Sequence, residues 1–280
     1  MADSLQSTFF QTEITGAVAH FIMNRPEKAN CMSPDFWEDL PRLVRQCETD
    51  DVIRAIVISG EGRHFTSGMD LSTFQGVLGL LDGEPGRASF ALRELILKLQ
   101  GTFSALDNSP LPVIAAIHGA CVGGGIDLIT ACDIRVASID AYFSIEEINI
   151  GMAADVGTLQ RLPKLIPPGI ARELALTGRR FSAQEANGWG LVNTLYESRQ
   201  EMIDGALQLA ADLASKSPLA ISGTKMVSNY ARDHSVADGL EQIALWNAGM
   251  LRPKDLMTAI EAKMSKKDAV FEDLKKRDAM

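Results

Sequence analysis

The sequence predicts an α/β fold, and three observations support this. Apolar, β-branched runs at 53–59 and 113–117 are typical of strands buried on both faces of a sheet. Segments with helical spacing of apolar residues alternate with such runs, as at 34–49. Toward the end of the chain only helical patterns remain. We therefore expect a core at residues 1–200, followed by a helical C-terminal region at residues 201–280.

Several elements carry local signals. Gly16 closes a turn between the first two strands, Ser33 and Pro34 suit the start of a helix, and Ser182 with Glu185 forms a capping-box pattern. We expect strands at 9–14, 17–23, 53–59, 113–117, 134–137, 141–144 and 190–193. We expect helices at 33–49, 88–106, around Asp127, and at 159–166, 169–177, 182–189, 199–215, 218–232 and 235–251. Residues 76–86, with four glycines and a proline, are expected to form a mobile loop.

Composition limits the classes of function. The 280 residues are 46% hydrophobic and 22% charged, which is ordinary for a soluble globular protein. A net charge of −9 argues against a nucleic-acid or anionic-membrane binder, because such proteins usually need a basic face. No apolar run approaches the roughly 18 residues that span a bilayer. The N-terminus lacks the patterns of a secretory signal or a transit peptide, so a cytoplasmic location is expected.

Four cysteines do not form a disulfide framework in a chain of this length. His118, Cys121 and Cys132 can be interpreted as metal ligands, but their spacing fits no standard site. They are better explained as small side chains of a buried strand-to-helix segment, and no metal is expected.

The central feature of the sequence is a glycine cluster between a strand and a helix. The strand at 113–117 leads into Gly119 and then into Gly123–Gly125, directly before the helical segment that contains Asp127. Such a loop presents free backbone N–H groups at the positive end of a helix dipole, where negative charge is stabilised. We expect this loop to hold an oxyanion.

Three carboxylates lie close to this loop in the sequence: Asp127, Glu147 and Asp155. All three stand among apolar residues, where burial raises the pKa of an acid into a range useful for proton transfer. Ordinary roles are the alternative: Asp127 bonded to nearby backbone, Glu147 solvated in a loop, and Asp155 capping a helix that begins near Val156. The hypothesis is proton transfer beside an oxyanion pocket.

The motifs together resemble the crotonase superfamily, also called the enoyl-CoA hydratase/isomerase family. The segments that carry the resemblance run through nearly the whole chain: Asn24-Arg25-Pro26 with Asn30, Phe65 to Leu71, Ala116 to Gly125, Ala131 to Arg135, and Thr158 to Pro163. The resemblance implies a spiral of ββα units and a helical C-terminal region that assembles a homotrimer or a homohexamer.

The resemblance also implies a substrate and a set of binding residues. Family members polarise the thioester carbonyl of an acyl-CoA with two backbone N–H groups, which correspond here to Met69 and Gly124. No separate cofactor is implied, because coenzyme A is part of the substrate. Arg25 is implied to meet the CoA phosphates. The substrate-binding residues implied are Ser67, Gly68, Met69, Asp70, Leu71, Gly124 and Arg25.

The acids distinguish subgroups of this family. Hydratases carry Glu at the positions of Asp127 and Glu147 and a small residue at Asp155, whereas the set here resembles the subgroup that converts 3,5-dienoyl-CoA to 2,4-dienoyl-CoA in the β-oxidation of unsaturated fatty acids. That reaction moves a proton from C2 to C6, so two acids must flank the chain. Glu147 is the expected C2 base and Asp155 the C6 donor, with the reverse assignment left open, and Asp127 orients the pair or holds a proton. The alternatives are an enoyl-CoA hydratase and a non-catalytic acyl-CoA- or RNA-binding relative.

Overall fold

The computed structural model describes residues 5–80, 82–251 and 253–274. Within these ranges, nine strands form two sheets. Six strands in the order β1-β2-β3-β4-β6-β9 form the larger sheet, which is parallel apart from the β1–β2 hairpin. The smaller sheet has the order β5-β7-β8. The strands are β1 (Phe10–Thr15), β2 (Val18–Met23), β3 (Ala55–Gly60), β4 (Val113–Ile117), β5 (Ala120–Val122), β6 (Ile134–Ser138), β7 (Tyr142–Ser144), β8 (Phe181–Ser182) and β9 (Thr194–Tyr196).

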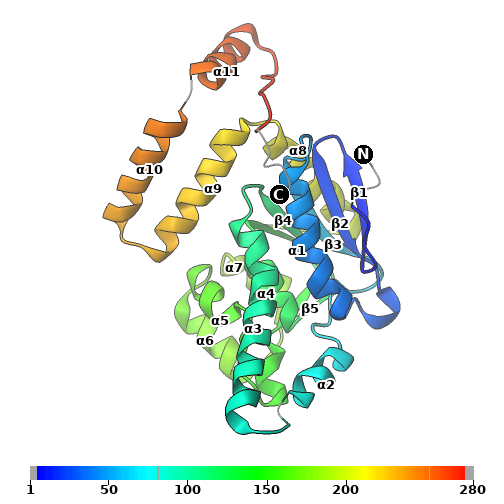
Figure 1. Ribbon diagram of the computed structural model, residues 1–280. Helices are drawn as coiled ribbons and strands as arrows, with labels where there is room; N and C mark the ends of the chain where they lie inside the picture. Colours follow the sequence, from blue (N-terminus) through cyan, green and yellow to red (C-terminus); the bar gives the residue numbers. More distant parts are fainter. Residues whose placement is uncertain (1–4, 81, 252, 275–280) are drawn as a thin grey trace.

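The helices cover the sheets and extend beyond them (Figure 1). The α-helices are α1 (Pro34–Thr49), α2 (Leu71–Gly79), α3 (Pro85–Asn108), α4 (Gly124–Thr130), α5 (Thr158–Arg161), α6 (Pro168–Thr177), α7 (Ala183–Gly188), α8 (Arg199–Ala214), α9 (Pro218–Asp233), α10 (Val236–Met250) and α11 (Pro253–Ser265). Short 3₁₀ turns lie at η1 (Pro26–Lys28), η2 (Glu146–Ile150) and η3 (Leu162–Lys164). None of the helices in the described ranges is long and apolar enough to cross a membrane.

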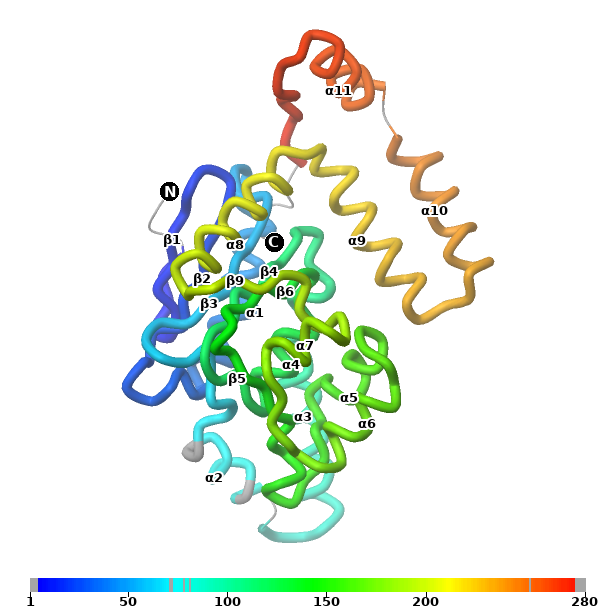
Figure 2. Tube along the Cα trace, turned by 180° about the vertical axis from the view of Figure 1, so that it is seen from behind, coloured from blue at the N-terminus to red at the C-terminus, as the bar shows by residue number. Residues whose placement is uncertain are grey.

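The inner strands β2, β3 and β4 of the larger sheet are buried on both faces, as their apolar sequences predict. Because side chains alternate along a strand, Ile56 and Ile58 of β3 face one core while Val57 faces the other. The second core is closed by α8, which lies across the sheet in Figure 2. The residues of α8 in that core are spaced four apart and mostly small: Met202, Ala206, Ala210 and Ala214. The spacing places these residues on one face of the helix, and their small side chains let the helix lie close against the strands.

The chain passes from one sheet to the other at a glycine. Strands β4 and β5 are consecutive in sequence but belong to different sheets, and Gly119 makes the corner between them with φ of +54°. A Cβ at this position would stand 2.2 Å from the Arg63 carbonyl oxygen, so only glycine fits. Strands β4 and β5 with α4 form one unit of the spiral that the family resemblance implied.

Some expectations need correction. Residues 76–79 and 85–86, expected in a mobile loop, belong to α2 and α3, and β5 was not anticipated because three residues carry too little periodicity. The last strand of the core occupies 194–196 instead of 190–193. The division at residue 200 stays a prediction, and α8, which crosses it, packs on the sheet of the core.

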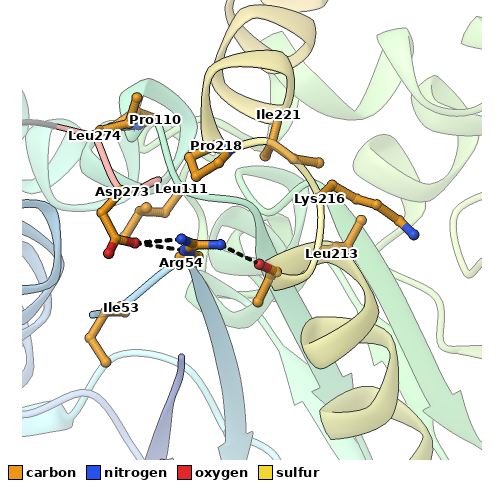
Figure 3. Close-up of a pocket in the computed structure, with 11 residues that line it drawn as sticks. Ile53, Arg54, Pro110, Leu111, Leu213, Lys216, Pro218, Ile221, Asp273 and Leu274 are labelled. Carbon is orange, nitrogen blue, oxygen red and sulfur yellow. Dashed lines mark hydrogen bonds and ion pairs between the residues drawn. The ribbon is translucent and has the colours of Figure 1, made fainter. Parts of the chain in front are cut away.

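The C-terminal helices α9, α10 and α11 project from the core as an arm (Figures 1 and 2). Lys225 fastens α9 to the core: its Nζ is buried and donates to the carbonyl oxygens of Leu106 and Leu111 and to Asp133 Oδ2 at 2.7 Å. The chain after α11 returns to the core at Arg54, which pairs with Asp273 at 2.7 Å and donates to the Ala214 carbonyl oxygen (Figure 3).

Candidate active site

A cavity of about 200 Å³ lies where α1, α2, the glycine loop and η2 meet. Its lining includes Ser67, Gly68, Met69, Gly124, Glu147 and Asp155, six of the residues selected from the sequence. The remaining wall is mostly apolar and comes from residues that the sequence did not single out: Trp37, Phe74, Ile150, Met152 and Val156. A cleft that is mostly apolar with a few convergent polar groups is the usual form of a small-molecule site.

Two main-chain amides are available at this cavity. The bridge between Met32 and Met69 uses the N–H of Met32 and the N–H of Asp70, and among the described hydrogen bonds neither the Met69 nor the Gly124 N–H is a donor. The two segments approach closely, since a Cβ on Gly68 would stand 3.5 Å from the Gly124 nitrogen and 3.0 Å from the Val122 carbonyl oxygen. Two free donors that line one apolar cleft can stabilise an oxyanion.

Glu147 lies beside the glycine loop. Its Oε1 is 3.4 Å from the place where a Cβ on Gly123 would stand, and its Oε2 is buried without a hydrogen-bond partner among the described residues. The pKa of Glu147 is raised to about 7, mainly by burial and in smaller part by the charges of Asp127 and Asp155. The alternative interpretation of Glu147 as a solvated loop acid is therefore wrong.

Asp127 is fully buried in α4 and does not line the cavity. Its Oδ1 accepts a hydrogen bond of 2.6 Å from the Thr158 N–H, while its Oδ2 has no partner within the described chain. Burial raises the pKa of Asp127 to about 6, against the opposing effect of the Thr158 hydrogen bonds. The structure thus places Asp127 behind Glu147, where its charge acts on the pKa of Glu147.

Asp155 lines the cavity from an irregular segment between η2 and α5. It does not cap a helix, because α5 begins at Thr158 with Gly157 at its N-cap position. Burial raises the pKa of Asp155 above the usual aspartate range. Glu147 and Asp155 are therefore two acids with raised pKa values on the wall of one cavity.

Two of the expected substrate-binding residues, Arg25 and Asp70, stand apart from this cavity. The Arg25 guanidinium pairs with Asp70 at 3.1 Å and donates to the Cys31 carbonyl oxygen, so these side chains join the loops that follow β2 and β3. Neither Arg25 nor Asp70 lines the cavity. The side chain of Leu71 lies outside the described part of the structure. The predicted contact of Arg25 with CoA stays a prediction.

The residues of the apolar wall could not be identified from the sequence. Trp37 belongs to α1 and Phe74 to α2, which are far from the glycine loop in sequence. Trp37 is 4% exposed, and its indole Nε1 has no hydrogen-bond partner among the described residues. Only folding brings these rings to the acids.

The α/β spiral, the glycine corner and the paired amides beside buried acids define a class of protein. The chain belongs to the enoyl-CoA hydratase/isomerase family, whose sequence model matches residues 13–272. The resemblance to this family and the expected fold class are therefore confirmed.

Individual relatives of known name are similar to most of this chain. A protein of Pongo abelii named mitochondrial Delta(3,5)-Delta(2,4)-dienoyl-CoA isomerase is 45% identical over 253 residues, which cover 90% of this chain and 77% of the relative. A peroxisomal protein of the same name from Arabidopsis thaliana is 44% identical over 92% of this chain and 94% of its own length. The crystal structure of an enoyl-CoA hydratase from Bacillus anthracis superposes with a TM-score of 0.86 at 29% identity and covers 95% of this chain and 99% of its own.

These comparisons correct one expectation. The protein was expected in the cytoplasm, but relatives that are 44–45% identical are named mitochondrial and peroxisomal, so that expectation is wrong. A compartment is decided by receptor-read addresses, which the composition of a folded domain does not report.

Proposed function

We propose that this protein is an isomerase that converts 3,5-dienoyl-CoA to 2,4-dienoyl-CoA in the breakdown of unsaturated fatty acids. The observation that carries the proposal is that Glu147 and Asp155, both with raised pKa values, line the same apolar cavity as the free amides of Met69 and Gly124. Relatives that cover most of the chain carry this activity in their names.

The reaction needs one proton to leave C2 and one to arrive at C6. Deprotonated Glu147 takes the C2 proton, and the charge that develops on the thioester oxygen is stabilised by the Met69 and Gly124 N–H groups. The double bonds then shift along the conjugated dienolate, and protonated Asp155 supplies the proton at C6. Atoms and charge balance, because one acid gains the proton that the other loses. The starting state returns when a proton passes back from Glu147 to Asp155, directly or through solvent.

The electrostatics of the acid cluster favour one proton shared by the two acids. The pair must hold one proton near neutral pH, and two neighbouring carboxylates in an apolar site resist double ionisation. Asp127 adds a third negative charge that raises the pKa of Glu147. We propose this as the role of Asp127: its charge raises the pKa of Glu147 from a position outside the cavity, and it does not contact the substrate.

The two proton-transfer roles can be tested separately. Isomerisation of a 3,5-dienoyl-CoA is followed by the ultraviolet absorbance of the conjugated product, and the C2 step alone is followed by hydrogen exchange at C2 in D₂O. Glu147→Gln should lose both activities by about 10²–10⁴-fold. Asp155→Asn should lose isomerisation to a similar degree and retain C2 exchange.

Other outcomes identify other functions. Loss of C2 exchange in Asp155→Asn, with exchange kept in Glu147→Gln, would reverse the two roles. If the wild-type protein leaves 3,5-dienoyl-CoA unchanged and hydrates a 2-enoyl-CoA, the hydratase assignment replaces the proposal. Binding of acyl-CoA without turnover of either thioester would indicate a non-catalytic relative.

We also propose that the protein assembles as a homotrimer, or as a homohexamer of two trimers. The arm exposes large apolar side chains along α10 and α11, including Leu240 at 64% and Met264 at 81% exposed. An apolar groove of about 340 Å³ lies among α9, α10 and α11 and is lined partly by Trp246 and Leu256. Exposed apolar patches of this kind mark interaction surfaces, and a second copy of the chain is an occupant that is always present.

The assembly is measured by light scattering on a sizing column. A mass of three or six chains is expected, compared with 30.3 kDa for one chain. Leu240→Glu should lower the mass, whereas a monomeric wild-type protein would contradict the proposal.

A further inference from the structure

One face of α3 carries three polar side chains at helical spacing, Gln100, Ser104 and Asp107, which we call the α3 polar stripe. Residues four and three apart share a helix face, so the stripe points in one direction. It faces the segment 155–161. Gln100 Nε2 donates to the Asp155 carbonyl oxygen at 2.7 Å, while Ser104 Oγ and Asp107 Oδ2 accept from the Arg161 guanidinium at 3.1 and 3.2 Å.

The segment around Asp155 has few hydrogen bonds, although the side chains of Ala154 and Val156 are buried in the core. Residues 153–156 belong to no helix or strand. Among the hydrogen bonds of the described residues, the one from Gln100 is alone in reaching the main chain of 153–156. The Asp155 main chain is therefore held by one hydrogen bond from α3 together with the packing of Ala154 and Val156 in the core, and the direction of its carboxylate depends on both.

The other end of the segment is fixed by the rest of the stripe. Arg161 is held by Ser104 and Asp107, and its Nη1 lies 2.0 Å from the place where a Cβ on Gly157 would stand. Between the two anchors lies Thr158, whose N–H donates to Asp127. The stripe thus holds both Asp155 and the donor that keeps Asp127 in place.

We propose that Gln100 is a positioning residue for proton transfer, because it holds the Asp155 backbone at the distance from the acyl chain that the C6 step requires. The inference rests on the proposed isomerase function and adds a residue that does not touch the cavity.

The surroundings of Gln100 indicate what its loss would do. Behind the segment lies a polar cavity of about 400 Å³ that is lined in part by Gln100, Val156 and Arg161. Without the Gln100 amide, residues 153–156 can relax toward this space. The apolar wall and the paired amides that bind the thioester would remain. The effect should therefore fall on kcat and leave KM nearly unchanged, because small misplacements of a reacting group cost rate more than affinity.

The test uses Gln100→Met, which keeps the shape of the side chain and removes the donor. Gln160→Met is the matched control, because Gln160 lines the same polar cavity, is exposed, and has no side-chain hydrogen bond among the described contacts. We expect Gln100→Met to lower kcat for 3,5-dienoyl-CoA about tenfold with KM within about twofold, and Gln160→Met to match the wild type.

A double variant shows whether the effect passes through Asp155. In an Asp155→Asn background, Gln100→Met should change the residual rate less than about twofold, because a misplaced amide that transfers no proton costs nothing further. A full tenfold effect in that background would show that Gln100 acts elsewhere and would overturn the inference.

A readout independent of turnover accompanies these rates. Amide hydrogen exchange of a peptide covering residues 153–161 should be faster in Gln100→Met than in the wild type and in Gln160→Met. If the wild-type protein isomerises the substrate while Gln100→Met equals it in both kcat and exchange, the inference about Gln100 is wrong and the function stands. If the wild-type protein does not isomerise, the proposed function fails, and an unchanged exchange rate would then also remove the structural role of Gln100.

Discussion

The Asp127 carboxylate accepts a 2.6 Å hydrogen bond from the Thr158 N–H with one oxygen, and its other oxygen is buried without a partner among the described residues. This arrangement satisfies a protonated acid or an amide better than a charge, because an ionised carboxylate in an apolar site loses more solvation than one hydrogen bond returns. The relationship has consequences for stability.

The first prediction concerns stability and pH. The pKa of Asp127 is raised to about 6 in the folded protein, from 3.8 when unfolded, so the folded state holds the proton more tightly. This contribution to stability is fully present below pH 3.8 and is lost as the pH rises to about 6. Asp127→Asn stays neutral throughout. Between pH 4 and pH 8 its free energy of unfolding should therefore improve relative to the wild type by up to about 3 kcal/mol.

Denaturant unfolding of both proteins at the two pH values checks this prediction. Asp140→Asn is a suitable control, because Asp140 is exposed and lies away from the acid cluster. A difference between wild type and Asp127→Asn that does not vary with pH would contradict the raised pKa.

The second prediction concerns the pH dependence of the C2 step. Glu147 acts as a base in its deprotonated form, so exchange at C2 should increase as the pH rises through about 7. The charge of Asp155 contributes to the raised pKa of Glu147, so Asp155→Asn should move this transition to lower pH. The pH profile of C2 exchange in D₂O, recorded for the wild type and for Asp155→Asn, measures the position of this transition. An unchanged transition in Asp155→Asn would show that the two acids do not interact as charges.

The third prediction concerns the main-chain amides. Gly68 has φ of +90°, and an added Cβ would lie 3.0 Å from the Val122 carbonyl oxygen and 3.5 Å from the Gly124 nitrogen. Gly68→Ala should separate the two donors and lower kcat by about 10²–10³-fold, the usual cost of one lost oxyanion donor. Gly169→Ala, in α6 with open space around the added methyl, should retain activity. Steady-state kinetics of both variants tests this prediction. Equal kcat values for Gly68→Ala and the wild type would exclude this pair of amides as the oxyanion site.

The fourth prediction concerns the attachment of the arm. Lys225 is 6% exposed in its side chain and donates to Asp133 at 2.7 Å. Lys225→Met removes the ammonium from Asp133, which keeps the Val113 N–H as a donor, and from two carbonyl oxygens, which should cost about 3–5 kcal/mol of stability. Thermal unfolding compares it with Lys28→Met, an exposed position where little change is expected. A loss below 1 kcal/mol would mean that water replaces the ammonium at no cost.

The candidate site could be predicted only in part. The glycine loop and the acids at 127, 147 and 155 stand within about 35 residues, and local patterns indicated both. The exclusion of Asp127 from the cavity could not be read from the sequence, because burial depends on α5 packing over α4. The pairing of Arg25 with Asp70 joins loops 45 residues apart and likewise has no local signal.

The sequence by itself determined the α/β class, the family and the identity of the acids, because strand and helix periods and short motifs are properties of neighbouring residues. Only the tertiary structure decided which acids share a cavity, which one stands behind them, and that Gln100 of α3 holds the backbone of Asp155. The physical reason is that the solvation and the direction of a side chain are set by atoms of residues far away in the chain. These residues come into contact only when the core has formed.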